Sequence, residues 1–423
     1  MEPNMKGAWI VVAPSECNEA LCGCADLVCT GSHDELTIQK AIDRAVEEGK
    51  NVYLLNGTYR IEGFYDFGDG GPKAAICAPN VGREIAIVGQ NAVYSENSGV
   101  RLYVPAETLA TLPDATETSD VDANVQDTAR NPVDVFRTTW CRRGLSSGSC
   151  LLLENLYFSL SHNQKPIRCV DLRRCDLPEL RTVKCGAYAD MEAGLGKPPA
   201  VPAKGCIGIT MTDGSNAGYS NFYNCGASGF YEGIQVSGEH VVMENCYAIM
   251  NYYGYTFGNY EINCGANHPI TLINCMDERN VCLPLFCGCG DAEKGTGRRL
   301  QGLQEVTMVS FNMERIAEQS PGGVLKDCMR EVYPGTWRGN IEFTAQPAWC
   351  HLNEPAFRLW ENDGSGVGFR VRNSCHKTVC GTEERLSYYP MLGQQIYDTD
   401  LSKLLTCIDP ESRTWVDAMG NQV

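Results

Sequence analysis

The chain has 423 residues, 43% of them hydrophobic, so it can bury a large core and is not a disordered segment. It carries 52 acidic and 35 basic residues, and the net charge of −17 disfavours nucleic acid and anionic membranes as partners. Charged residues make up only 21% of the chain and show no heptad pattern, which disfavours a coiled-coil rod. No run of about 18 apolar residues occurs, so we expect no membrane-spanning helix.

The first residues, 1–6, contain no basic stretch that leads into an apolar run, so we expect no signal peptide and folding in a reducing cytoplasm. The 23 cysteines are then expected to be mostly free thiols that behave as small buried hydrophobes. The glycine-rich segment 68–71 lacks the Lys and Ser or Thr of a phosphate-binding loop, and we expect no cofactor.

Three groups of cysteines have spacings that resemble metal sites. None contains the paired C-x2-C motifs of common zinc sites, so we expect buried thiols and no bound metal. The groups are Cys17, Cys22, Cys24 and Cys29; Cys282, Cys287 and Cys289; and Cys375 and Cys380 with His376 between them.

Residues 32–49 are predicted to form the clearest helix. Ser32 and Glu35 have the spacing of a capping box, and Gly49 fits a C-terminal cap. Its apolar face would consist of Ile38, Ala41, Ile42, Ala45 and Val46.

Strands are predicted after this helix. Residues 51–61 read as two strands joined by a turn, and residues 84–89 read as another strand. Residues 105–133 are polar and contain Pro, Thr, Asp and Asn, so they predict a long exposed loop.

From about residue 150 onward, short apolar strands end in similar four-residue segments. Their spacing is roughly 20 to 30 residues, with insertions, which is typical of a solenoid. In a parallel β-helix the Asn of each segment would lie at a turn in left-handed geometry, and its amide would bond to the next coil. The Cys that follows would point inward. The segments are 154–157, 183–186, 223–226, 244–247, 273–276 and 311–314.

This repeat predicts at least six coils of parallel β-helix over residues 51–330. Residues 1–50 would form an N-terminal segment with the capping helix, and residues 331–423 a small C-terminal β module for attachment or subunit contact. The alternative is a β-sandwich or propeller in which the Asn-Cys pairs recur by coincidence. The cysteines predicted to be buried free thiols are Cys185, Cys225, Cys246 and Cys275.

Segments near the N-terminus resemble the entry of pectin-lyase-like β-helix proteins. The resemblance implies an all-β fold, a single-stranded right-handed parallel β-helix in which helix 32–49 caps the open end of the solenoid. The segments that carry it are 25–35, 38–39, 41–43 and 53–61.

The C-terminal segment is similar to the terminal part of many tailed-phage virion proteins, often tail fibres and tailspikes. The match covers residues 393–401, Lys403 and residues 415–420, but residues 404–407 stand where a Trp-rich turn is common. The resemblance implies a virion protein, other tail proteins as partners, and a homotrimer. The C-terminal module would supply a hydrophobic docking patch made of Phe357, Trp360, Phe369 and Trp415.

The strip between residues 226 and 280 is the richest in groups that suit a polysaccharide. A depolymerase needs two carboxylates across the scissile bond, or a base with an acid neutraliser. Aromatic faces beside carboxylates suit sugar rings, whereas the alternative is an ordinary solvated strip of turns. The candidate catalytic residues are Glu232, Asp277 and Glu278, and the candidate substrate-binding residues are Tyr231, Tyr252, Tyr253 and Arg279.

Alignment of the coils on the repeated segments predicts how these residues stack. Glu232 is expected beside Tyr253, one coil further on, with Asp277 and Glu278 a coil or two away. The first predicted column is Phe230, Asn251 and Arg279, and the second is Tyr231, Tyr252 and Asn280.

Three functions are consistent with these features. The first is a phage tail or virion appendage protein that contacts polysaccharide of the host surface and in some cases degrades it. The second is a free polysaccharide lyase or glycoside hydrolase, and the third is a structural virion protein without a ligand.

Overall fold

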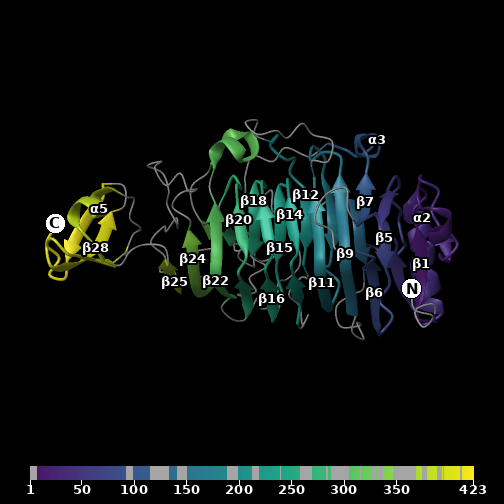
Figure 1. The fold of residues 1–423 in the computed structure, drawn as a ribbon, viewed down its shortest axis with the longest axis horizontal. Coiled ribbons are helices and arrows are strands. Elements are labelled where there is room, and N and C mark those ends of the chain that lie inside the picture. Colours follow the sequence, from purple (N-terminus) through teal and green to yellow (C-terminus); the bar gives the residue numbers. More distant parts are fainter. Residues whose placement is uncertain are drawn as a thin grey trace, which may run out of the picture.

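The structure is a computed structural model. It describes residues 7–91, 99–114, 133–140, 150–187, 199–211, 219–238, 240–257, 269–282, 284–286, 304–314, 316–325, 330–331, 337–345, 368–373, 379–387, 393, 395–409 and 412–423. Strands dominate these residues and are arranged in three sheets. Figure 1 shows an elongated stack of strands that runs from the N-terminal helices to β25, with a small separate sheet beyond it at the C-terminal end.

The largest sheet, here called sheet A, has 17 strands among the described residues, all paired in parallel. Its strands are β1 (Trp9–Ala13), β2 (Leu27–Val28), β3 (Asn51–Leu54), β4 (Gly57–Arg60), β6 (Glu84–Gly89), β7 (Val100–Val104), β9 (Cys150–Leu160), β11 (Leu177–Gly186), β13 (Asn221–Tyr223), β14 (Gly226–Ser228), β16 (Val241–Glu244), β17 (Tyr247–Ile249), β19 (Ile270–Ile273), β20 (Met276–Glu278), β22 (Gln304–Glu314), β24 (Trp337–Ala345) and β25 (Gly368–Asn373).

The second sheet, sheet B, has eight described strands, which are parallel. They are β5 (Ala74–Ala78), β8 (Val133–Thr138), β10 (Ile167–Asp171), β12 (Cys206–Thr210), β15 (Glu232–Val236), β18 (Tyr253–Phe257), β21 (Leu285–Phe286) and β23 (Arg330–Glu331). The helices described are α1 (Glu19–Cys22), α2 (Asp34–Glu47), α3 (Ala106–Ala110), η2 (Ala317–Gln319), η3 (Pro321–Gly323) and α5 (Thr382–Ser387).

Each coil follows one path through both sheets. In one coil the chain runs along β13, turns at Asn224, runs along β14, turns at Gly229 and continues along β15 in sheet B. The next coil repeats this with β16, β17 and β18, each paired in parallel with its counterpart. The fold is therefore the predicted parallel β-helix. The eight described strands of sheet B belong to successive coils, which confirms the expectation of at least six.

The predicted Asn turns are confirmed where Asn occupies them. Asn224, Asn245 and Asn274 have φ of 52°, 54° and 51°, in the left-handed region that Asn tolerates. The Asn274 Nδ2 donates to Asn245 Oδ1 at 2.6 Å, so amides link adjacent coils. In two coils the turn residue is Thr182 or Ser310 instead, so the alignment of segments 183–186 and 311–314 was wrong by two residues in each case.

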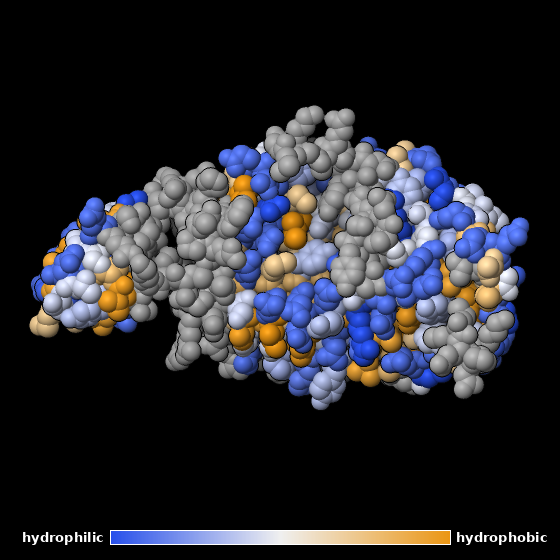
Figure 2. All heavy atoms as spheres, in the orientation of Figure 1, coloured by the Kyte–Doolittle hydropathy of each residue, from blue (hydrophilic) through white to orange (hydrophobic). Residues whose placement is uncertain are grey.

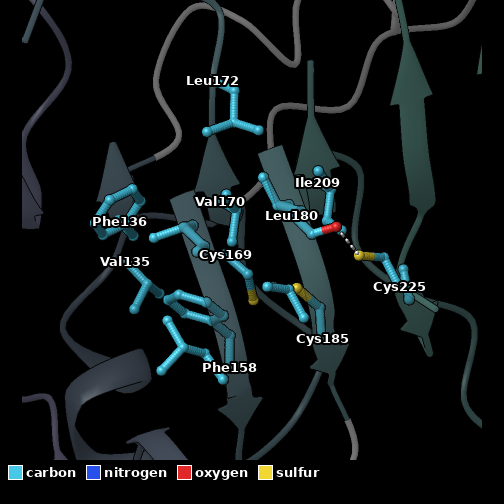
Figure 3. Close-up of a cluster of buried hydrophobic side chains, with 14 of the residues drawn as sticks. Val135, Phe136, Phe158, Cys169, Val170, Leu172, Leu180, Cys185, Ile209 and Cys225 are labelled. Carbon is cyan, nitrogen blue, oxygen red and sulfur yellow. Dashed lines mark hydrogen bonds between the residues drawn. The ribbon is translucent and has the colours of Figure 1, made fainter. Parts of the chain in front are cut away.

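The thiols that follow these turns form a buried column. Cys225, Cys246 and Cys275 are fully buried, and each Sγ donates to a carbonyl oxygen of the preceding coil at 3.4 to 3.6 Å. Figure 3 shows the first of these bonds, from Cys225 to Leu180. Burial raises the pKa of Cys246 well above its usual value. All three are free thiols, as predicted, and so is Cys185, which lies two residues beyond this column.

The capping helix is present, but its N-terminus differs from the prediction. Helix α2 begins at Asp34, after His33, which has a left-handed φ of 50° and makes no side-chain cap. The predicted capping box does not form, because the Glu35 side chain makes its hydrogen bonds to the first coil instead. It accepts one from Tyr65 Oη at 2.9 Å and one from the backbone N–H of Glu62 at 3.1 Å. The apolar face is confirmed, since Ile38, Ala41, Ile42 and Ala45 are all buried.

Two other segments differ from the expectations. Cys17 and Cys22 form a disulfide, so two cysteines of the first group are not free thiols. Most of the other described cysteines are buried free thiols. Helix α3 lies inside the segment expected to be a loop, and its Leu109 is buried in the core.

Among the described residues, no group of three or more His, Cys, Asp or Glu side chains is arranged to hold a metal. Cys287, Cys289, Cys375 and His376 lie outside those residues.

The solenoid extends beyond the expected boundary at residue 330. Strand β24 pairs with β22, and β25 pairs with β24, so Phe369 belongs to the β-helix. A separate four-stranded sheet follows, made of β26 (Val379–Cys380), β27 (Gln395–Asp398), β28 (Lys403–Asp409) and β29 (Thr414–Asp417). Trp415 is fully buried in the core of this sheet and so does not form an exposed patch. Phe357 and Trp360 lie outside the described residues.

Candidate functional site

Most of the buried charged residues in the described strands lie on the outer face of sheet B, the face turned away from the solenoid core. In the strands of this part of sheet B, two consecutive side chains that point into the core lie between two that point outward. In β10 the two inward side chains are Cys169 and Val170 (Figure 3). Outward side chains therefore recur three residues apart. Register aligns them into two columns: Arg168, Ile207, Glu232 and Tyr253 in the first, and Asp171, Thr210, Gln235 and Thr256 in the second.

Glu232 is the central acidic group of this face. It is fully buried, and its Oε2 accepts from Gln235 Nε2 at 2.8 Å and from Thr256 Oγ1 at 3.0 Å. Its Oε1 is buried and has no hydrogen-bond partner among the residues that the structure describes. Burial raises the pKa of Glu232 to about 6, against the opposing effect of these two hydrogen bonds and of Arg168. A carboxyl group that titrates near neutral pH is suited to proton transfer.

The three predicted tyrosines lie together beside Glu232. The rings of Tyr231 and Tyr252 stack with centroids 4.8 Å apart and planes 9° from parallel. Tyr253 meets both rings edge-on, at 6.0 Å and 5.1 Å between centroids. Tyr253 is in register with Glu232 on the next coil, as predicted. Tyr231 and Tyr253 are buried, so Tyr252 presents the accessible part of this cluster.

A buried ion-pair network adjoins Glu232 on the preceding coils. Arg168 Nε donates to Asp134 Oδ1 at 2.6 Å, and Arg173 forms an ion pair with Asp171 at 2.8 Å. Burial raises the pKa of Asp134 to about 7. Burial also opposes ionisation of Asp171, but Arg173 and Arg168 outweigh it and hold the pKa of Asp171 well below its usual range.

This network was not predicted from the sequence, since its residues lie outside the strip 226–280. A signal was present, since Arg168 and Asp171 interrupt an apolar run, and a charge inside a buried strand needs a partner.

Asp277 points into the interior rather than onto this face. A Cβ atom placed on Gly254 would lie 2.4 Å from Asp277 Oδ2, so the carboxyl group lies directly beneath sheet B. Asp277 is fully buried, on the opposite side of the sheet from the outward column of Glu232 and Tyr253. The structure therefore does not bring Asp277 and Glu232 together as a pair across a substrate.

Glu278 and Arg279 belong to a different cluster, next to β22 in sheet A. Arg279 Nε donates to Glu314 Oε1 at 2.8 Å, and Asn312 Nδ2 donates to Glu278 Oε1 at 3.1 Å. Burial raises the pKa of Glu278, and the negative charge of Glu314 adds to that effect. These contacts tie both residues to the following coil rather than to the tyrosines.

The predicted columns were wrong by one residue in this last coil. Asn280, not Arg279, aligns with Asn251, as shown by the hydrogen bond from the backbone N–H of Asn251 to Asn280 Oδ1 at 2.7 Å. Arg279 occupies a left-handed turn with φ of 54°, and Val281 follows Tyr252 in the second column. Asn280 Nδ2 also donates to the carbonyl of Ala248 at 2.9 Å, so this column is a buried amide ladder.

Comparison with known proteins identifies similar folds only at a distance. No family model matches the chain, and no curated protein matches it. A tailspike protein of Acinetobacter phage vB_ApiP_P1 aligns at 12% identity and a TM-score of 0.39, over 81% of this chain and 56% of that one. Tailspike protein 3 of bacteriophage CBA120 aligns at 12% identity and a TM-score of 0.32, over 91% and 67%.

A third solved structure, ORF18 of Geobacillus virus E2, aligns at 10% identity and a TM-score of 0.30, over 90% of this chain and 65% of that one. The chain thus spans little more than half the length of the first of these structures. Similarity at this level says nothing about the activity of this chain. Among the described helices, none has the length and apolar character needed to cross a membrane.

Proposed function

We propose that this chain is a tail or appendage protein of a phage virion that binds polysaccharide of the host surface. Two features support the proposal. The segment at 393–420 resembles the C-terminal part of tailed-phage virion proteins, and part of it forms the small sheet of β27 to β29. The observation that carries the binding site is the cluster of Tyr231, Tyr252 and Tyr253 against the buried carboxyl group of Glu232.

The chemistry of this cluster suits a sugar. The C–H faces of a pyranose pack on aromatic rings, and sugar hydroxyl groups bind to carboxylate oxygens. Tyr252 would make the first contact because it is the accessible ring, and Tyr231 and Tyr253 hold it in place. Within the described part of the chain, Glu232 Oε1 has no hydrogen-bond partner, so it is proposed to accept from a sugar hydroxyl group that reaches between the rings.

Binding is tested with polysaccharide from the host capsule or cell wall. A Tyr252→Ala, Tyr253→Ala variant should lose at least about tenfold in affinity, since it removes both the accessible ring and one of the two rings that hold it, and an aromatic contact is worth on the order of 1 kcal/mol. The matched control is Tyr397→Ala, which removes an exposed tyrosine from β27, far from this site in the chain. Unchanged binding by the folded double variant would refute the assigned site.

Depolymerisation is the second candidate, and the raised pKa of Glu232 favours it. Of the three carboxyl groups predicted to be catalytic, only Glu232 adjoins the tyrosines; Asp277 and Glu278 do not pair with it. Incubation of the polysaccharide with the protein, followed by an assay for new reducing ends or unsaturated sugars, separates an enzyme from a binding protein. Glu232→Gln should abolish any such activity and retain the fold.

The assembly proposed here is a homotrimer in the virion. A β-helix exposes one long side of a parallel sheet, and closed symmetry is the common way in which identical chains cover such a side. The four-stranded sheet at the C-terminus, with its own core around Trp415, is proposed as the part that contacts other virion proteins. Light scattering at micromolar concentration that returns the mass of one chain would contradict the trimer.

A further inference from the structure

A second outward face of sheet A is formed by β7, the C-terminal halves of β9 and β11, β14 and β17. In these strands Leu156, Phe158 and Ala227 point into the core, so the alternate residues point outward. Register aligns the outward residues into two columns, which we call the basic face. The columns are Arg101, Tyr157, Lys184, Gly226 and Tyr247, and Tyr103, Ser159, Gly186, Ser228 and Ile249.

The basic face has the opposite charge balance to the whole chain. Acidic residues outnumber basic ones by 52 to 35 in the chain, and hydrophilic residues are spread along the whole length of the described surface in Figure 2. In the two described columns no residue is acidic, whereas Arg101 and Lys184 are basic. The next residue of the second column is Glu278, which bounds the face at β20. A local positive charge on an acidic protein favours an anionic ligand.

Aromatic side chains lie close against this face because glycine occupies neighbouring positions. A Cβ atom on Gly226 would overlap the ring of Tyr247, so that ring packs on the bare backbone of the preceding coil. A Cβ atom on Gly186 would likewise overlap Tyr157 Oη. Lys184 Nζ lies 5.4 Å from the centroid of the Tyr247 ring. The column therefore holds an ammonium group between two tyrosines.

Arg101 is fixed at the other end of the same column. Its Nη2 donates to Ser159 Oγ at 3.1 Å, and its guanidinium group stacks on Tyr103 at 4.4 Å from the ring centroid. Its Nε is buried and has no hydrogen-bond partner in the described part of the chain. In register Arg101 and Lys184 are two coils apart, which is roughly 10 Å. This separation is about the length of a disaccharide, so both charges can contact one chain of sugars.

Packing alone does not account for a lysine at position 184. The side chain is half-buried, and burial lowers the pKa of Lys184 below its ordinary value, because a charged group loses hydration there. A methionine of similar length would contact the same neighbours without that loss. The charge is therefore kept against stability, which is characteristic of groups that serve binding or catalysis.

We propose that the basic face binds a sugar that carries a carboxylate, so that the polysaccharide recognised by this protein is acidic. The inference rests on the glycan binding proposed above and names the class of glycan. Tyr247 and Tyr252 belong to one coil, on either side of the left-handed turn at Met250, so the basic face adjoins the proposed glycan site.

The arrangement of charges and rings favours a carboxylate over a phosphate. A carboxylate attached to a sugar ring can pair with Lys184 or Arg101 while the ring itself packs on a neighbouring tyrosine. A phosphodiester polymer of open-chain alditols has no ring to place against Tyr157 or Tyr247. The matching unit is therefore a uronic acid or a similar acidic sugar.

The first test changes the ligand. Polysaccharide from the host capsule or cell wall is compared with the same material after its carboxylates have been reduced to primary alcohols. The wild type should bind the reduced polymer at least about tenfold more weakly, since charge-assisted hydrogen bonds are lost. Equal affinity for the two polymers would overturn the inference and leave the proposed glycan binding standing, whereas binding to neither would refute both. Loss of binding only after removal of phosphate with hydrofluoric acid would also overturn it.

The second test changes the protein. Lys184→Met should bind the native polymer about tenfold more weakly, bind the reduced polymer as the wild type does, and unfold at no lower temperature. Lys184→Arg should retain most of the affinity. The matched control is Lys40→Met, which removes the same charge from an exposed position on α2 and should bind like the wild type. Equal losses of affinity by Lys184→Met for the native and the reduced polymer would show a structural role and overturn the inference.

Discussion

Thr256 donates a hydrogen bond to Glu232 across two adjacent coils, at 3.0 Å from Oγ1 to Oε2. This bond and the one from Gln235 are the hydrogen bonds that lower the pKa of a carboxyl group whose burial raises it to about 6. Thr256→Val should therefore raise the pKa of Glu232 further above 6. Infrared or ¹³C-glutamate titration, with Glu232→Gln used for assignment, measures the shift, and a lower pKa in the variant would contradict the assigned role of Thr256.

The raised pKa of Glu232 predicts how stability depends on pH. The folded protein binds this proton more tightly than the unfolded chain, so the group favours folding below its unfolded pKa, and that contribution is lost as pH rises through about 6. The difference corresponds to about 2 kcal/mol. Glu232→Gln should gain roughly that much relative to the wild type between pH 4 and pH 8, as measured by denaturant unfolding. The control substitution is Glu244→Gln, which replaces an exposed glutamate on β16 in the same way.

Cysteine reactivity should follow the three environments in the structure. Cys24 is exposed and should react with a thiol reagent in the native protein. Cys225 and Cys246 are fully buried and should react only after unfolding, and Cys17 should react only after reduction of its disulfide. Peptide mapping by mass spectrometry assigns each site. Rapid native labelling of Cys246 would contradict the buried column.

The amide ladder should be important for stability. The Asn280 side chain accepts a hydrogen bond from the backbone N–H of Asn251 and donates one to the backbone carbonyl of Ala248. Asn280→Ala therefore removes the side-chain partner of both buried backbone groups. The expected loss is about 2 to 4 kcal/mol in the free energy of unfolding, since each unsatisfied group costs roughly 1 to 3 kcal/mol. Asn221→Ala on the exposed face of β13 is the control and should change stability by less than about 0.5 kcal/mol. A similar effect of both substitutions would argue against the ladder.

The repeat was predictable because it depends on local chemistry. Asn tolerates left-handed geometry and a small thiol fits the interior, so Asn-Cys at 224–225, 245–246 and 274–275 predicted both the turn and the buried column. The position of Glu232 beside Tyr253 followed from the same alignment. The alignment failed where other residues take the turn, as Thr182 does, because Thr at that position carries no comparable signal.

The sequence by itself determined the fold class, the buried cysteines and the tyrosines around Glu232, since all of these depend on the period of the coil. It also determined the capping helix, because the apolar face of that helix depends only on the helical spacing of local residues. Only the tertiary structure decided which carboxyl groups share a surface. Asp277 and Glu278 are neighbours in the chain, but successive residues of a strand point to opposite faces, so one lies in the core and the other outside. Arg168 and Glu232 are far apart in the sequence, yet stacking of the coils places them in one column, and the charge of Arg168 acts on the pKa of Glu232.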